Sequence, residues 1–104
     1  MRKDYNKLVR DRIPEIIQAS GKKAIVRTAD DEEYNSFLRQ KLQEEVDEFI
    51  ESGDPEELAD ILEVITALAE TYDQSFDILQ DAADNKRKAR GGFKDRVILI
   101  SVES

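Results

Sequence analysis

Hydrophobic side chains recur at helical spacing through the middle of the chain, and two long segments carry the clearest pattern. In the first segment, apolar positions spaced i, i+3, i+4 and i+7 comprise Tyr34, Phe37, Leu38, Leu42, Val46, Phe49 and Ile50. In the second, the same spacing comprises Leu58, Ile61, Leu62, Ile65, Leu68, Ala69 and Tyr72. Each segment therefore predicts an amphipathic helix.

Residues with strong positional preferences mark the ends of these two helices. The first begins among residues 28–33, which are rich in N-cap and acidic side chains, and it ends at Ser52 and Gly53. The second begins with Asp54 at the N-cap and Pro55 at the first helical position. Because the connection is short, the two helices should pack as an antiparallel hairpin.

Shorter elements are expected on both sides of the hairpin. Residues 14–19 predict a short helix of about one to two turns, and a fourth helix should run from near Ser75 to Gly91 and Gly92. Residues 96–102 are β-prone, and a small β pairing with residues 23–27 is a further expectation. The sequence thus predicts one all-α domain over residues 1–104 with a helical hairpin at its core.

The hairpin presents more apolar surface than its own chain can cover. The flanking helices offer few large hydrophobic residues, namely Ile16, Ile17, Phe76, Ile78 and Leu79. Two hairpins that pair into a four-helix bundle would cover these surfaces, and twofold symmetry is the commonest way to pair them. We therefore expect a homodimer, or a dimer of dimers.

Composition narrows the chemistry. The 104 residues include no cysteine and no histidine, which excludes zinc fingers, thiol nucleophiles and histidine-based triads. The net charge of −8 disfavours a nucleic-acid polymer as partner. No apolar run is long enough for a signal peptide or a membrane span, and a chain without cysteine suits the reducing cytoplasm.

Charge is strongly segregated along the chain. Residues 30–84 carry 19 acidic and two basic side chains, whereas the other residues carry 14 basic and five acidic ones. Such a distribution suits a compact polyanion that carries divalent cations. No glycine-rich phosphate loop is present, so the chain is not a P-loop enzyme.

Several of the acids fall on the apolar faces of the predicted helices. At about 100° per residue, Glu45 lies between Tyr34 and Leu38 on the helical projection, Glu48 lies beside Tyr34, and Glu44 borders the stripe. A buried carboxylate is costly unless it is paired or binds a metal.

On the second helix, Glu57 and Asp60 continue apolar lines toward the N-terminus. An antiparallel hairpin would bring these two residues beside Glu44, Glu45 and Glu48. Ligation by oxygen alone selects Mg²⁺, or Mn²⁺, over zinc.

Simpler roles remain open for some of these residues. Glu57 follows Asp54 by three positions and would also complete a capping-box-like helix start. Glu44 would also form an ordinary surface pair with Lys41. On the last helix, Lys86, Arg87 and Arg90 are candidates to meet phosphates, or they complement the helix dipole. A capping or packing role is equally open for a second basic patch, made of Lys7, Arg10 and Arg12.

The acidic motif resembles that of a known family. Glu44–Glu48 followed by Glu57–Asp60 matches the E-E-x-x-E … E-x-x-D signature of the MazG-like, all-α nucleoside triphosphate pyrophosphohydrolase superfamily. Tyr5–Ile17 and Lys86–Phe93 are similar to the opening and closing motifs of its phosphoribosyl-ATP pyrophosphohydrolase-like branch. The resemblance spans roughly residues 5–100.

The resemblance implies an enzyme that cleaves a nucleoside triphosphate to a monophosphate and pyrophosphate. Both ordinary triphosphates and non-canonical ones, which a house-cleaning enzyme removes, are candidate substrates. It implies Glu45, Glu48, Glu57 and Asp60 as Mg²⁺ ligands and Glu44 as a ligand or a residue behind the ligands, with Glu44 and Glu45 our catalytic candidates. It also implies phosphate contacts from the residues Asn85, Lys86 and Arg90, to which helical spacing adds Arg87. Only eight residues separate Glu48 from Glu57, fewer than in many relatives, so base specificity does not carry over. Phosphoribosyl-ATP hydrolysis in histidine biosynthesis and a non-catalytic helical interaction module are the alternative functions.

Overall fold

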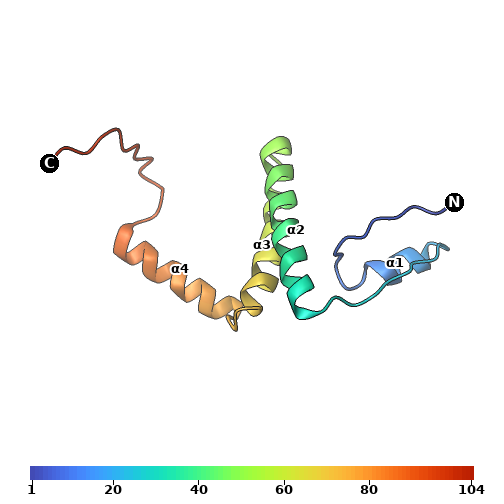
Figure 1. The fold of residues 1–104 in the computed structure, drawn as a ribbon. Coiled ribbons are helices and arrows are strands. Elements are labelled where there is room, and N and C mark those ends of the chain that lie inside the picture. Colours follow the sequence, from blue (N-terminus) through green and yellow to red (C-terminus); the bar gives the residue numbers. More distant parts are fainter.

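The computed structural model describes all 104 residues and contains four helices and no strands (Figure 1). They are α1 (Ile13–Ala19), α2 (Asp31–Ser52), α3 (Glu56–Glu70) and α4 (Phe76–Arg90). The prediction of an all-α chain with two long central helices and one shorter helix on each side is confirmed. None of the four helices combines the length and the apolar character that a membrane span needs.

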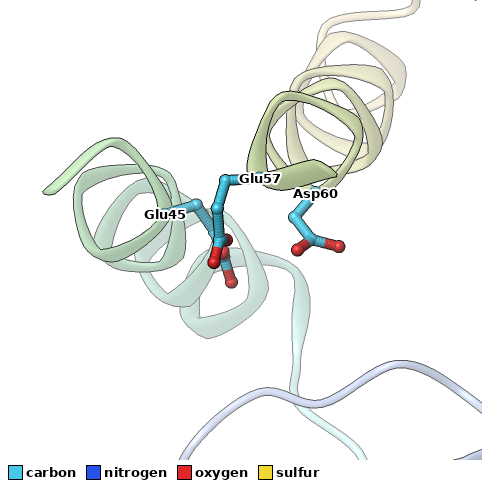
Figure 2. A group of neighbouring side chains, drawn as sticks. All are labelled: Glu45, Glu57 and Asp60. Atoms are coloured by element: carbon cyan, nitrogen blue, oxygen red, sulfur yellow. The ribbon is translucent and has the colours of Figure 1, made fainter. Parts of the chain in front are cut away.

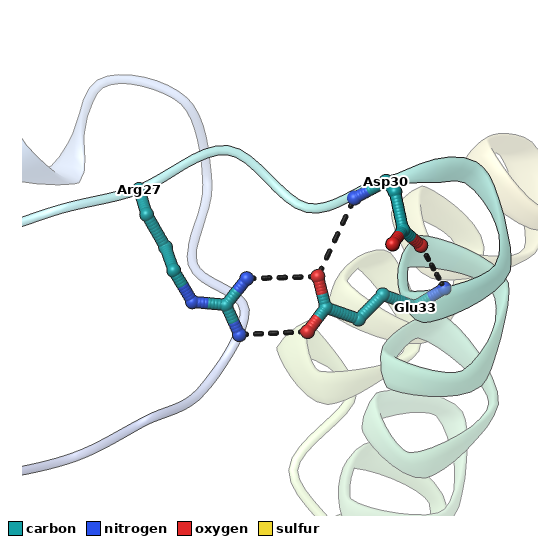
Figure 3. Close-up of polar contacts among 3 residues, drawn as sticks. All are labelled: Arg27, Asp30 and Glu33. Atoms are coloured by element: carbon teal, nitrogen blue, oxygen red, sulfur yellow. Dashed lines mark hydrogen bonds and ion pairs between the residues drawn. The ribbon is translucent and has the colours of Figure 1, made fainter.

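A capping box and an ion pair stabilise the start of α2 (Figure 3). The Asp30 side chain accepts a hydrogen bond from the Glu33 N–H at 2.8 Å, and the Glu33 carboxylate accepts one from the Asp30 N–H, which completes a capping box. Arg27 donates to both oxygens of the same carboxylate, from Nη1 to Oε1 at 2.8 Å and from Nη2 to Oε2 at 2.7 Å. This bidentate ion pair lowers the pKa of Glu33 and directs the preceding segment into the helix.

The turn between α2 and α3 forms the hairpin that the sequence predicts. Gly53 adopts a left-handed conformation, with φ of 67°, that glycine tolerates best, and its N–H donates to the Phe49 carbonyl at 2.8 Å. Asp54 then accepts a hydrogen bond from the Glu56 N–H at 3.0 Å. The predicted helix start is one residue too early: Pro55, and not Asp54, is the N-cap of α3, and Glu56 is the first helical residue. Asp54 stabilises this end from the position before the N-cap.

The hairpin contains the core of the molecule. Its buried hydrophobic side chains are only three: Leu38 of α2, and Val64 and Ala69 of α3. At the end of the hairpin opposite the turn, Asn35 donates to the Thr71 hydroxyl at 3.0 Å and Arg39 donates to the Tyr72 hydroxyl. These two polar contacts tie the start of α2 to the residues that follow α3.

The outer helices leave the hairpin largely uncovered (Figure 1). Helix α4 contacts only α3, near the turn that joins them, and then extends away, whereas α1 packs on none of the other helices. The chain is accordingly elongated, at 64 × 32 × 24 Å. Large hydrophobic side chains that remain half or more exposed on the hairpin include Ile50 and Leu58, at 74% and 50%.

The expected β pairing of residues 23–27 with residues 96–102 is wrong. Both segments are irregular, and they lie on opposite sides of the hairpin, because α1 and α4 project from it in different directions (Figure 1). Their apolar side chains are exposed, with Ile25 at 79% and Ile100 at 91%. Residues 96–102 have high β propensity, but no segment of the same chain lies beside them to pair as a strand.

Candidate metal centre

Three carboxylates from two helices converge near the closed end of the hairpin (Figure 2). Glu45 comes from α2, and Glu57 and Asp60 come from α3. One oxygen from each of the three lies within 4.8 Å of the others. We call this group the acidic triad.

The local structure explains why these residues meet. Glu57 and Asp60 are three positions apart and so share one face of α3, while the turn at Gly53 folds that face back onto the second half of α2. Glu45 is 9% exposed, which confirms the prediction that it lies inside the apolar stripe of its helix. Glu57 and Asp60 are half-buried.

The other predicted acids lie beside the triad or outside it. Glu48 is exposed and is not part of the triad, although its charge raises the pKa of both Glu45 and Glu57. Glu44 is exposed. Lys41 forms its ion pair with Glu45, at 3.6 Å, rather than with Glu44.

The capping alternative for Glu57 is not realised. Asp54 donates its N–H to the Ser52 hydroxyl at 3.1 Å, so no bond returns to it from the Glu57 side chain. The Asp54 carboxylate accepts from the N–H of Glu56. The Glu57 side chain is therefore free to face Glu45 and Asp60, the other two members of the triad.

Two carboxyls of the triad, those of Glu45 and Glu57, have pKa values above the ordinary one. Burial, and then the charge of Glu48, raises the pKa of Glu45, against the opposing charge of Lys41. Burial likewise raises the pKa of Glu57, and the charges of Glu48, Asp60 and Glu45 raise it further. A carboxyl whose pKa rises on folding stabilises the fold below its unfolded pKa, and this contribution is lost as the pH rises through the folded pKa. Once ionised, Glu45 is therefore a cost to stability that a cation would relieve.

Two basic side chains already touch the triad. Lys41 contacts Glu45, and Arg10 of the N-terminal segment donates to Asp60 at 2.8 Å between Nη2 and Oδ1. Sequence analysis does not predict this contact, since 50 positions separate Arg10 from Asp60 and the basic patch of Lys7, Arg10 and Arg12 left capping and packing open. Its only signal was the place of Arg10 within the N-terminal motif.

The predicted phosphate contacts lie elsewhere in the chain. Asn85, Lys86, Arg87 and Arg90 are exposed on the half of α4 that is farther from the hairpin. Arg87 pairs within its own helix with Asp84, at 3.2 Å. Since α4 meets only α3, near the end opposite the triad, one chain does not bring these residues and the acids together (Figure 1).

Comparison with known proteins adds one short similarity. No family model and no solved structure matches the chain. An uncharacterized protein of Mycolicibacterium smegmatis is 58% identical over 41 residues, which cover 39% of this chain and 42% of that protein. The chain thus matches less than half the length of this relative.

Proposed function

We propose that the chain is a Mg²⁺-dependent nucleotide pyrophosphohydrolase, which cleaves a nucleoside triphosphate to a monophosphate and pyrophosphate. The observation that carries the proposal is the acidic triad, whose three carboxylates converge from two helices while one of them is almost fully buried. Burying a carboxylate beside like charges is costly, and a bound divalent cation removes that cost. The match to the MazG-like acidic motif supports the same reaction.

The donor set fits magnesium. Glu45, Glu57 and Asp60 offer only carboxylate oxygens, the ligands that Mg²⁺ and Mn²⁺ prefer. The family resemblance adds Glu48, which lies outside this group in one chain. When bound, the cation would neutralise phosphate charge and lower the pKa of a coordinated water. Glu57 and Asp60 of α3, together with Glu45 of α2, would hold the cation.

The reaction needs a water that attacks the α-phosphorus. A new phosphorus–oxygen bond forms there, the bond from the α-phosphorus to the bridging oxygen breaks, and pyrophosphate leaves with that oxygen. Glu44 and Glu45 are our candidates to accept the proton of the water. Phosphoribosyl-ATP would undergo the same chemistry, and the sugar and base of the substrate remain to be identified in an assay of many nucleotides.

We further propose that the working enzyme is a homodimer in the cytoplasm. The small core and the exposed apolar side chains of the hairpin support a partner hairpin on this surface. An open apolar groove also runs between α2, α3 and α4, lined by Leu42, Ile65, Leu68, Tyr72 and Leu79. A second copy would supply its own basic α4 end to an acidic triad, which one chain does not achieve.

Thermal unfolding tests the cation site. Millimolar Mg²⁺ should raise the melting temperature of the wild type by about 3–8 °C, the shift expected for a ligand present well above its dissociation constant. Glu45→Gln should melt higher than the wild type in metal-free buffer at pH 7, because it removes a charge that folding disfavours, and it should respond little to Mg²⁺. In metal-free buffer the gap between the two proteins should narrow as the pH falls, because the raised pKa of Glu45 lets its carboxylate take up a proton sooner than an ordinary one.

Glu56→Gln is the matched control, because Glu56 is an exposed neighbour of Glu57 outside the triad. It should respond to Mg²⁺ like the wild type. A wild type whose melting temperature is the same with and without Mg²⁺ would contradict the cation site and favour the non-catalytic interaction module.

A further inference from the structure

Arg10 differs from the other basic side chains of the N-terminal segment. Its guanidinium reaches across the molecule to Asp60, whereas the others interact within a few residues: Arg2 with Asp4, Arg12 with Glu15, and Lys3 and Lys7 with the ring of Tyr5. The backbone carbonyl of Arg10 accepts a hydrogen bond from the Ile13 N–H at 3.0 Å. The start of α1 thus anchors the main chain, and the side chain extends from it to the triad.

The pair between Arg10 and Asp60 is suited to exchange. Its two side chains are 58% and 44% exposed, and a single nitrogen–oxygen contact of 2.8 Å joins them. Exposed ion pairs of this kind contribute little to stability, so they open at little cost. The guanidinium also occupies a carboxylate that belongs to the triad. A divalent cation at the triad would repel it, since both carry positive charge a few ångströms apart.

A displaced guanidinium would lie beside the phosphates of the substrate. Mg²⁺ in proteins is commonly held by a few carboxylates together with substrate phosphates. Two oxygens of a phosphate can accept two parallel hydrogen bonds from the planar guanidinium, as the two oxygens of a carboxylate can, and the phosphate carries more negative charge. The N-terminal segment passes the hairpin on the side toward which the triad carboxylates point (Figure 2). Arg10 already reaches Asp60 from this segment, which leaves its guanidinium beside any phosphate held at the triad.

We propose that Arg10 is an exchangeable counter-ion of the site, which a divalent cation displaces from Asp60 and which then binds the phosphates of the substrate. This inference rests on the proposed function, since it takes the triad as the cation site. It assigns to Arg10 a role in the reaction cycle in place of capping or packing. Two binding measurements of opposite expected sign test it.

The first measurement is Mn²⁺ affinity without nucleotide, from the electron paramagnetic resonance signal of free Mn²⁺. Arg10→Gln should bind Mn²⁺ about three- to tenfold more tightly than the wild type, because the cation no longer competes with a positive charge. Arg10→Lys keeps the charge and should stay within about twofold of the wild type. Arg12→Gln is the matched control, because Arg12 pairs locally with Glu15, and its affinity should be unchanged.

The second measurement is the affinity of the Mg²⁺-saturated protein for inorganic pyrophosphate, by isothermal titration calorimetry. Here Arg10→Gln should bind about tenfold more weakly than the wild type, the loss expected for one charge-assisted contact. Arg12→Gln should again match the wild type. If Arg10 had only a packing role, Arg10→Gln would bind both Mn²⁺ and pyrophosphate more weakly. Tighter binding of Mn²⁺ together with weaker binding of pyrophosphate therefore identifies the exchange.

The outcomes separate this inference from the proposed function. A wild type that does not bind Mn²⁺ overturns both. If the wild type binds Mn²⁺ but Arg10→Gln binds it equally or more weakly, the cation site stands and the exchange is overturned. Unchanged pyrophosphate affinity in Arg10→Gln, or no pyrophosphate binding by the wild type, likewise overturns it.

Discussion

Replacing Glu45 or Asp60 with alanine should reduce pyrophosphate release at least about 100-fold, which is the scale of loss when a group that stabilises transition-state charge is removed. Each substitution takes one carboxylate from the acidic triad, and the two residues approach it from different helices. Helical circular dichroism should change little, because alanine is the best helix former and neither replacement removes an apolar side chain. The measurement is Mg²⁺-dependent pyrophosphate release by the purified variants.

Glu56→Ala is the control for this pair, since it removes an exposed acid from the first turn of α3 without touching the triad. It should retain the activity of the wild type. Full activity in either Glu45→Ala or Asp60→Ala would remove the basis for a metal centre on these residues.

The second large effect is expected on assembly. At micromolar concentration, light scattering should give a mass of at least twice the 11.9 kDa of one chain, and the melting temperature should rise with protein concentration. The reason is the contrast between three buried hydrophobic residues and the many exposed ones along the hairpin. Leu62 is 49% exposed on α3, and Leu62→Glu should shift the protein toward the monomer by placing a charge in the partner interface.

A matched control for Leu62→Glu is Ile98→Glu in the C-terminal tail. Ile98 is 81% exposed and lies outside the hairpin, so its replacement should leave the mass unchanged. A wild-type mass near that of one chain would contradict the dimer. It would also contradict any site in which α4 of a second copy supplies the phosphate contacts.

Local signals explain why the helices were predictable. Asp30, Gly53 and Ser75 act within one turn of their own positions, as caps or as a left-handed helix end, so sequence alone places the boundaries of α2 and α4 within a residue or two. Helical spacing was sufficient to place Glu45 among apolar neighbours. The same spacing put Glu57 and Asp60 on one face of α3, and with a short turn this brings the triad together.

Contacts between distant segments were not predictable in this way. The spacing placed Glu48 beside Tyr34 on the stripe, yet Glu48 is exposed, because the single layer formed by α3 covers only part of α2. The tail residues 96–102 have strand propensity, but the direction of α4 carries them away from residues 23–27 (Figure 1). Arg10 and Asp60 meet because the N-terminal segment lies beside the hairpin, and no local sequence pattern predicts that placement.

Product analysis of a nucleotide panel tests the central proposal most directly. The purified protein would be incubated with ordinary, deoxy and damaged nucleoside triphosphates and with phosphoribosyl-ATP, with Mg²⁺ or with excess chelator, and all products would be separated. The account predicts that at least one substrate yields monophosphate and pyrophosphate in equal amounts, only when Mg²⁺ is present. Release of diphosphate and inorganic phosphate, cleavage that persists in chelator, or no cleavage of any substrate would contradict it.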